Sequence, residues 1–105
     1  MTDLDSTFSA LSHQARRAIL KQLATGEMRL SDLAEPFDMS QTAVSKHVRI
    51  LCDAGLVTME QRGRTRYCRL NAIPMRAALD WIADYETFWQ GQFDSLARHL
   101  AKEGL

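Results

Sequence analysis

Three arginines recur at every second residue in the segment QRGRTR, residues 61–66. Arg62, Arg64 and Arg66 each carry a permanent cation with a planar fork of donors, which suits phosphate groups and the negative potential of a narrow minor groove. Alternate residues of a regular strand share one face, so we expect the three guanidinium groups to be presented together. An exposed hairpin made soluble by arginine is the alternative interpretation.

These arginines belong to a basic middle segment in a chain whose charge is otherwise balanced. The 105 residues carry 13 Lys and Arg against 13 Asp and Glu. Residues 40–70 sum to +4, whereas residues 1–39 and 71–105 each sum to −2. A local excess of this kind is typical of a surface that binds a polyanion, although a solvated face would show the same excess.

A second polar set lies in QTAVSKHVRILCDA, residues 41–54, opposite the apolar stripe of Val44, Val48 and Leu51. Gln can pair with adenine, Ser and Thr with several base edges, and Lys and Arg with guanine or phosphate. For the histidine beside the stripe, packing or a phosphate contact is expected rather than catalysis. The candidate DNA-binding residues are Ser40, Gln41, Thr42, Ser45, Lys46, His47, Arg49, Arg62, Arg64 and Arg66.

The sequence contains no recognisable catalytic motif. The sequence shows no Gly-rich phosphate loop, no paired-carboxylate motif and no Ser/His/Asp arrangement, so we expect neither an enzyme nor a cofactor. The two cysteines, Cys52 and Cys68, form no CxxC motif. They are interpreted as small, partly buried apolar side chains, with a thiol redox sensor as the alternative.

Helix signals position the second polar set. Ser12, Ser31 and Ser40 each precede an apolar periodic stretch and are predicted N-caps. Gly26 and Gly55 stand where the first and third of these helices should end. The segment of residues 30–57 therefore predicts two short helices joined by a tight turn.

The rest of the chain predicts a hairpin followed by a long helix. Extended runs at residues 56–61 and 64–70 flank Gly63, which can adopt the positive φ of a hairpin turn. After Pro74 the pattern is helical to about Lys102, as one helix or as two with a break near Gly91. This order predicts a mainly α winged helix-turn-helix with a small β-hairpin. We expect one domain, 1–105, with a recognition helix at about 41–54, a wing at about 57–70 and a C-terminal dimerisation helix at about 74–102.

The C-terminal helix carries more aromatic surface than one narrow stripe needs. Five of the eight aromatic residues fall there, which indicates a partner surface rather than intrachain core alone. The expected interface residues on this helix are Trp81, Tyr85, Phe88, Trp89, Phe93 and Leu96.

The chain resembles the ArsR-type (ArsR/SmtB-like) family of winged-helix bacterial repressors over roughly residues 8–100. The resemblance is carried by LSHQARRAILKQLATGE, LSDLAEPFDMSQTAVSKHVRILCDAGLV, RGRTRYCRL and PMRAALDWIADYETFWQGQF. It implies a homodimeric, DNA-binding transcriptional regulator, usually a repressor. It also implies that Leu4, Phe8 and Leu11 complete the dimer interface.

The resemblance is to a subgroup of the family that lacks metal ligands. The family's metal site on its third helix reads E-L-C-V-C-D-L, and the matching stretch here has Arg29 and Ser31 at the two thiolate positions. The site on the C-terminal helix is represented only by His99, and one histidine cannot hold zinc. We therefore expect a metal-independent regulator.

Location and partners follow from coarser features. The low cysteine content, the absence of an apolar run near 18 residues and the acidic N-terminus without a signal pattern predict a cytoplasmic protein with no membrane partner. Expected partners are double-stranded DNA and a second copy of the chain, and the sequence names no inducer. A protein–protein adaptor that binds an acidic partner through the basic segment is the remaining alternative.

Overall fold

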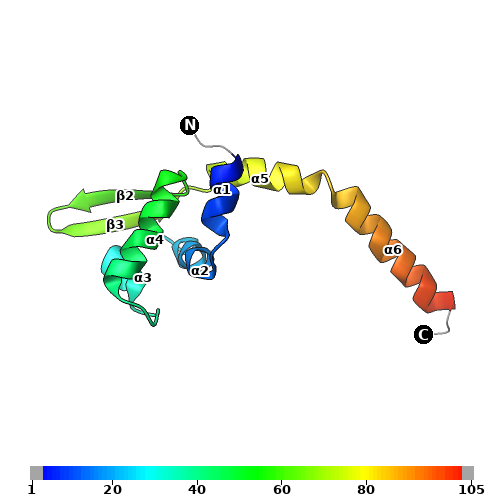
Figure 1. Cartoon of the computed structure of the whole chain (residues 1–105), viewed down its shortest axis with the longest axis horizontal. Helices are drawn as coiled ribbons and strands as arrows, with labels where there is room; N and C mark the ends of the chain where they lie inside the picture. The colour runs from blue at the N-terminus through cyan, green and yellow to red at the C-terminus, as the bar shows by residue number, and fades with distance from the viewer. Residues whose placement is uncertain (1–3, 103–105) are drawn as a thin grey trace.

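The computed structural model of the chain describes residues 4–102 and is mainly helical, with a small antiparallel sheet (Figure 1). This confirms the predicted fold class. The elements are α1 (Leu4–Leu11), α2 (Gln14–Leu23), β1 (Met28–Arg29), α3 (Leu30–Ala34), α4 (Gln41–Asp53), β2 (Val57–Arg62), β3 (Thr65–Leu70), α5 (Ile73–Ala83) and α6 (Glu86–Lys102).

The core lies between α2, α3, α4 and the base of the sheet. Val44, Val48 and Leu51 of α4 are completely buried, as the apolar stripe predicted, and they pack in one cluster with Ile19 of α2 and Leu33 of α3. Burial of this stripe fixes the rotation of α4 about its axis, because the opposite polar face must then remain in solvent.

Of the three predicted serine caps, only Ser40 is found. Its hydroxyl accepts a hydrogen bond from the backbone N–H of Ala43 at 3.1 Å. The prediction for Ser12 is wrong, because His13 caps α2 through Nδ1, which accepts from the N–H of Ala15 at 3.0 Å. Ser31 lies inside α3, since pairing of β1 keeps the chain extended only to Arg29.

The sheet contains a strand that the sequence did not predict. β1 is two residues long and pairs antiparallel with β3, giving the order β1-β3-β2. The predicted hairpin is present, with Arg62 paired to Thr65 across a two-residue turn. Gly63 in that turn has φ of 62°, a conformation that costs glycine little.

The C-terminal region forms two helices. α5 packs against α1, and the ring of Trp81 contacts that of Phe8 edge-on with centroids 5.8 Å apart. The break lies between Ala83 and Glu86, so the expected break near Gly91 is wrong; Gly91 lies inside α6. One glycine costs a helix only about 1 kcal/mol, which is too little to end it.

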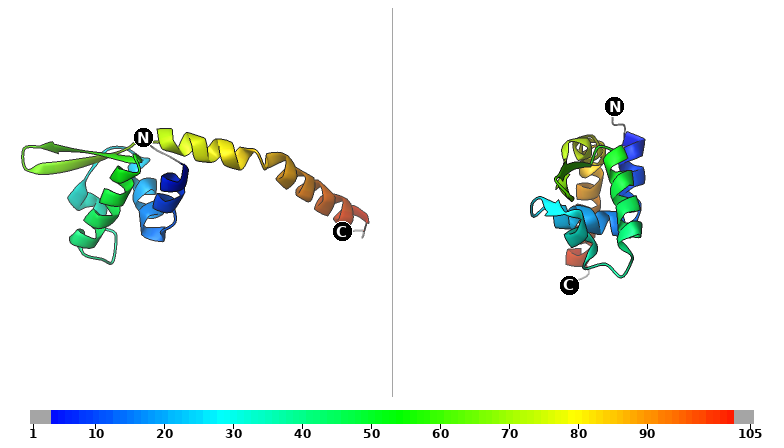
Figure 2. Two further views of the ribbon diagram at one scale, coloured as in Figure 1. Left: turned by 45° about the horizontal axis from the view of Figure 1, so that its top comes forward. Right: turned by 90° about the vertical axis from the view of Figure 1, so that its left-hand side faces the viewer.

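The molecule is elongated because α6 leaves the core. Figures 1 and 2 show α6 extending away from the other helices and the sheet, and none of its residues is buried. The extents are 65 × 32 × 20 Å and the radius of gyration is 18.7 Å, against about 13 Å for a compact domain of this length. No helix within residues 4–102 has the length and apolarity to span a membrane.

Candidate nucleic-acid interface

The first turns of α4 present the polar set to solvent. Ser40 caps the helix, and Gln41, Thr42, Lys46 and Arg49 are exposed on the side away from the core. Ser45 is half-buried on the same side, where it lines a cleft with Gln41. Because the apolar stripe is fully buried, these side chains are held on a rigid element facing outward.

The wing divides its arginines between two faces. Arg62 is paired with Thr65, and Gln61 with Arg66. Directly paired residues share a face and successive residues alternate, so Arg62 and Arg66 lie on opposite faces of the hairpin. The expectation of one shared face is wrong, because the alternation of a single strand does not continue through a two-residue turn.

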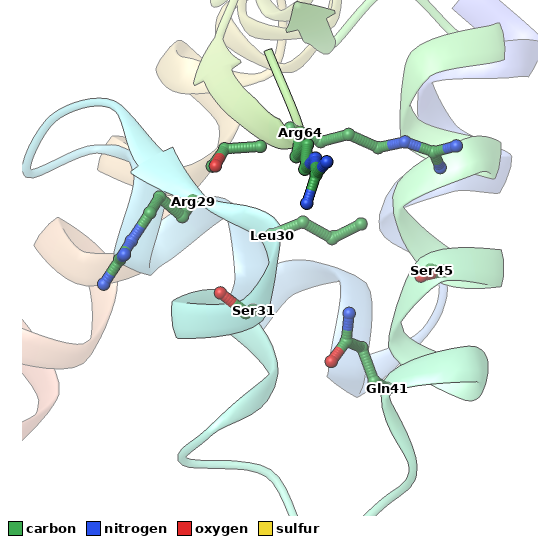
Figure 3. Close-up of a pocket in the computed structure, with 8 residues that line it drawn as sticks. Arg29, Leu30, Ser31, Gln41, Ser45 and Arg64 are labelled. Carbon is green, nitrogen blue, oxygen red and sulfur yellow. The ribbon is translucent and has the colours of Figure 1, made fainter. Parts of the chain in front are cut away.

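A polar cleft separates α3 and α4 from the wing. It has a volume of about 320 Å³, and Arg64 and Arg66 of the wing line it together with Gln41 and Ser45 of α4. Figure 3 shows Gln41 and Ser45 on one side of the cleft, Leu30 and Ser31 on the other, and Arg64 at its edge. An adjoining cleft of about 530 Å³ is lined by Thr42, Lys46, Arg49, Cys52, Met59 and Arg66, among others.

Four of the five cations around these clefts form no ion pair in the part of the chain that the structure describes. Among residues 4–102, Lys46, Arg49, Arg64 and Arg66 make no ion pair, whereas Arg62 pairs with two carboxylates on the other face of the hairpin. Arg29, which lines the first cleft, pairs with Asp32 at 2.8 Å. The two clefts therefore carry four unpaired cations against one lining carboxylate, Asp53, and this excess of positive charge suits a polyanion.

His47 is half-buried and turns toward His13 and Arg16 rather than lying on the free polar face. Its Nδ1 lies 3.3 Å from a guanidinium nitrogen of Arg16, and its ring centroid is 4.5 Å from that of His13. Desolvation lowers the pKa of His47, and the nearby charges of His13 and Arg16 lower it further. The contact between Arg16 and His47 could not be predicted from sequence patterns, because the two residues lie on different helices that are distant in the sequence.

The two thiols are poor nucleophiles. Burial raises the pKa of Cys68 to about 11, and it also raises that of Cys52, to which the nearby Asp53 contributes. Thiol chemistry needs the thiolate, and thiols with raised pKa remain protonated near neutral pH. The raised pKa values of both thiols therefore disfavour the redox interpretation.

Metal ligands are not brought together in the part of the chain that the structure describes. Within residues 4–102, no group of three or more His, Cys, Asp or Glu side chains could hold a metal ion. Ser31 and Arg29, at the expected thiolate positions, instead line the cleft beside α4.

The expected interface residues divide into two groups. Leu4, Phe8 and Leu11 are half-buried within the chain, and Phe8 packs on Trp81. The residues of α5, α6 and the turn between them are 47–63% exposed, and they are Trp81, Tyr85, Phe88, Trp89, Phe93 and Leu96. The single chain therefore leaves these large apolar side chains about half exposed or more, as the predicted partner surface requires.

The segment that contains α4 matches a known protein family. Residues 13–59, which include α2, α3 and α4, match the model described as "Bacterial regulatory protein, arsR family".

Similar proteins extend the match to most of the chain. The transcriptional repressor SdpR of Bacillus subtilis is 30% identical over 82 residues, which are 78% of this chain and 91% of the relative. The HTH-type transcriptional regulator Rv2034 of Mycobacterium tuberculosis is 31% identical over 100 residues, which are 95% of this chain and 91% of the relative. A crystal structure of an ArsR family transcriptional regulator superposes with a TM-score of 0.76 at 34% identity, covering 86% of this chain and 97% of that one.

Proposed function

Because the chain belongs to the ArsR family of bacterial regulatory proteins, we propose that it is a metal-independent repressor that binds a two-fold operator as a homodimer. As a member of this family, the chain is a DNA-binding transcriptional regulator and not an enzyme. We further propose how α4 and the wing contact DNA, how two copies of the chain join, and that DNA binding does not depend on a metal ion.

The observation that carries the mode of binding is the unpaired positive charge at the junction of α4 and the wing. α4 enters a major groove with Gln41, Thr42 and Ser45 toward the base edges. The wing then lies over the adjacent minor groove with Arg64 and Arg66, and the intervening phosphates pass the cleft between them.

The assembly is supported by the uncovered face of α5 and α6. No residue of α6 is buried in the single chain, although Phe88, Trp89 and Phe93 are large and apolar. Two copies joined through this face form a two-fold dimer, which presents two α4 helices to half-sites about one DNA turn or slightly more apart.

Independence from metal is supported by the residues at the family's thiolate positions. Arg29 places a cation there, and its guanidinium is held by Asp32. Ser31 supplies only a neutral hydroxyl. A cation beside a divalent metal would repel it, so these residues do not suit the site.

Footprinting on the DNA upstream of the protein's own gene tests the proposal, because repressors often control their own promoter. We expect a protected region with two related half-sites, and an affinity that falls steeply with salt while remaining sequence-dependent. Stoichiometric zinc, cadmium or arsenite should leave that affinity unchanged. Equal binding to the operator and to unrelated duplexes, or release by one of these metals, would refute it.

A further inference from the structure

Arg62 is the most heavily engaged side chain of the wing. One of its terminal nitrogens donates to Glu27 Oε1 at 2.7 Å and to Glu60 Oε2 at 3.0 Å, and the other donates to Glu27 Oε2 at 3.3 Å. Its guanidinium carbon lies 4.6 Å from the centre of the Tyr67 ring. The hydrogen bonds to Glu60 and Glu27 raise the pKa of Arg62, so the group is permanently charged.

These contacts cross the whole sheet on the face opposite to that of Arg66. Arg62 is the last residue of β2, Tyr67 is on the central β3, and Glu27 immediately precedes β1. Glu60 and Tyr67 are paired across β2 and β3, so they share the face of Arg62. The side chain therefore links the outermost strand to the opposite edge of the sheet.

The outer part of the wing needs such a link. β1 pairs only with Tyr67 and Cys68, so the hairpin beyond Tyr67 has two strands and no third. Figure 1 shows this part projecting past α4. A two-stranded ribbon is marginally stable by itself, and its direction depends on the side chains that restrain it.

We propose that Arg62 and Glu27 form a clamp that sets the direction of the wing relative to α4, so that Arg62 acts on DNA binding through Glu27 and not by contacting phosphate. This inference rests on the proposed function, which supplies the DNA. Arg62 is then a positioning residue, and the phosphate contacts of the wing come from Arg64 and Arg66, which have no ion-pair partner among residues 4–102.

The two possible roles of Arg62 predict opposite effects at Glu27. Removing an acidic charge near DNA should strengthen binding if electrostatics alone matter. If the clamp positions the wing, E27Q and R62Q should each weaken operator binding by about two- to five-fold, the range that an exposed ion pair supports. The double variant E27Q/R62Q should be no weaker than R62Q alone.

A charge swap adds a matched test. E27R/R62E keeps the net charge and reverses the ion pair between positions 27 and 62. We expect each single reversal to weaken operator binding and the double reversal to restore most of it, with an unchanged dependence on salt. E27R/R76E has the same net charge but no clamp, and because Arg76 is exposed on α5 and lines neither cleft, this variant should not recover affinity.

Hydrogen exchange of the free protein tests the clamp without DNA. We expect faster exchange of the wing amides beyond Tyr67 in E27Q and R62Q, and recovery in the charge swap, with the midpoint of thermal unfolding little changed. An affinity equal to or above wild type in E27Q, or no rescue by the swap together with unchanged exchange, would overturn the clamp while leaving the proposed function standing. Absence of sequence-dependent binding by the wild-type protein would instead overturn the proposed function, and the clamp's role in DNA binding with it.

Discussion

Arg16 links three helices through its guanidinium. Its Nε donates to the carbonyl of Ala10 at 2.8 Å and a terminal nitrogen donates to that of Ser9 at 3.1 Å, so it satisfies carbonyl groups at the end of α1. The other terminal nitrogen lies 3.3 Å from His47 Nδ1 on α4. Arginine can only donate, so Nδ1 must accept, and the bond requires an unprotonated Nδ1 at His47.

This geometry predicts that stability decreases as the pH falls below about 6.5. Above that value His47 is neutral in both the folded and the unfolded chain. Because the folded-state pKa of His47 is lowered, the unfolded chain binds the proton first, and the free energy of unfolding decreases through the window between the two pKa values. His13 and Arg16, which face His47, hold its pKa down and so widen that window.

His47→Gln tests this assignment, because a Gln side-chain oxygen can accept from Arg16 without titrating. Urea unfolding between pH 7 and 5 should show a shallower loss of stability for the variant than for the wild-type protein. Identical pH dependence in the two proteins would show that His47 does not contribute.

Gln41 and Ser45 line the cleft beside the wing, and the proposed binding mode turns them toward the base edges. Gln41→Ala and Ser45→Ala should each cost about 1–3 kcal/mol on the operator and little on unrelated duplexes. Gln14→Ala is the matched control, since Gln14 is exposed on α2 and lines neither cleft. If both variants weaken binding to the operator and to unrelated DNA equally, these two side chains contact the DNA backbone and not the bases.

At the scale of elements, the structure follows local signals where those signals are sufficient. The apolar period of α4, the Ser40 cap and Gly63 in the hairpin turn are all encoded within a few residues, and each prediction from them is confirmed. β1 could not be predicted, because two residues become a strand only when β3 is folded beside them.

The candidate site shows the same division. Its polar residues on α4 were predictable because helical periodicity separates them from the core. The separation of Arg62 from Arg66 was not, since it depends on the pairing register across the turn. The partnership of Arg62 with Glu27 spans 35 positions and exists only in the folded sheet.

The wing as an element should contribute to binding on all duplexes. Arg64→Ala and Arg66→Ala should each weaken binding to any sequence and reduce the magnitude of the salt slope by about one unit for each phosphate that is no longer neutralised. Arg76→Ala, on α5 and exposed, removes the same charge away from the clefts and should leave the slope unchanged. A wild-type slope in both wing variants would mean that the wing does not touch DNA.

The whole molecule has more apolar surface than one copy can cover. α1 and α5 contact each other, but α6 projects from them with Phe88, Trp89, Phe93 and Leu96 more than half exposed (Figure 2). A second copy would remove this surface from water, with each aromatic side chain burying on the order of 150–250 Å². It would also double the basic segments available to DNA, which allows +4 per chain to suffice in a neutral protein.

The dimer is tested by placing a charge on that face. Trp89→Glu or Phe93→Glu would bury a carboxylate between two copies, so we expect monomers in sedimentation at micromolar concentration and loss of operator binding, although α4 and the wing are untouched. Thr87→Glu is the matched control, because it adds the same charge on the side of α6 opposite to Trp89. Successive helical residues are about 100° apart, so two positions correspond to about half a turn. This variant should remain dimeric. Circular dichroism separates the loss of assembly from unfolding of α6, which has no intrachain core to hold it. A wild-type protein that sediments as a monomer and still binds the operator at full affinity would contradict the dimer, and the aromatic face of α6 would then need another partner.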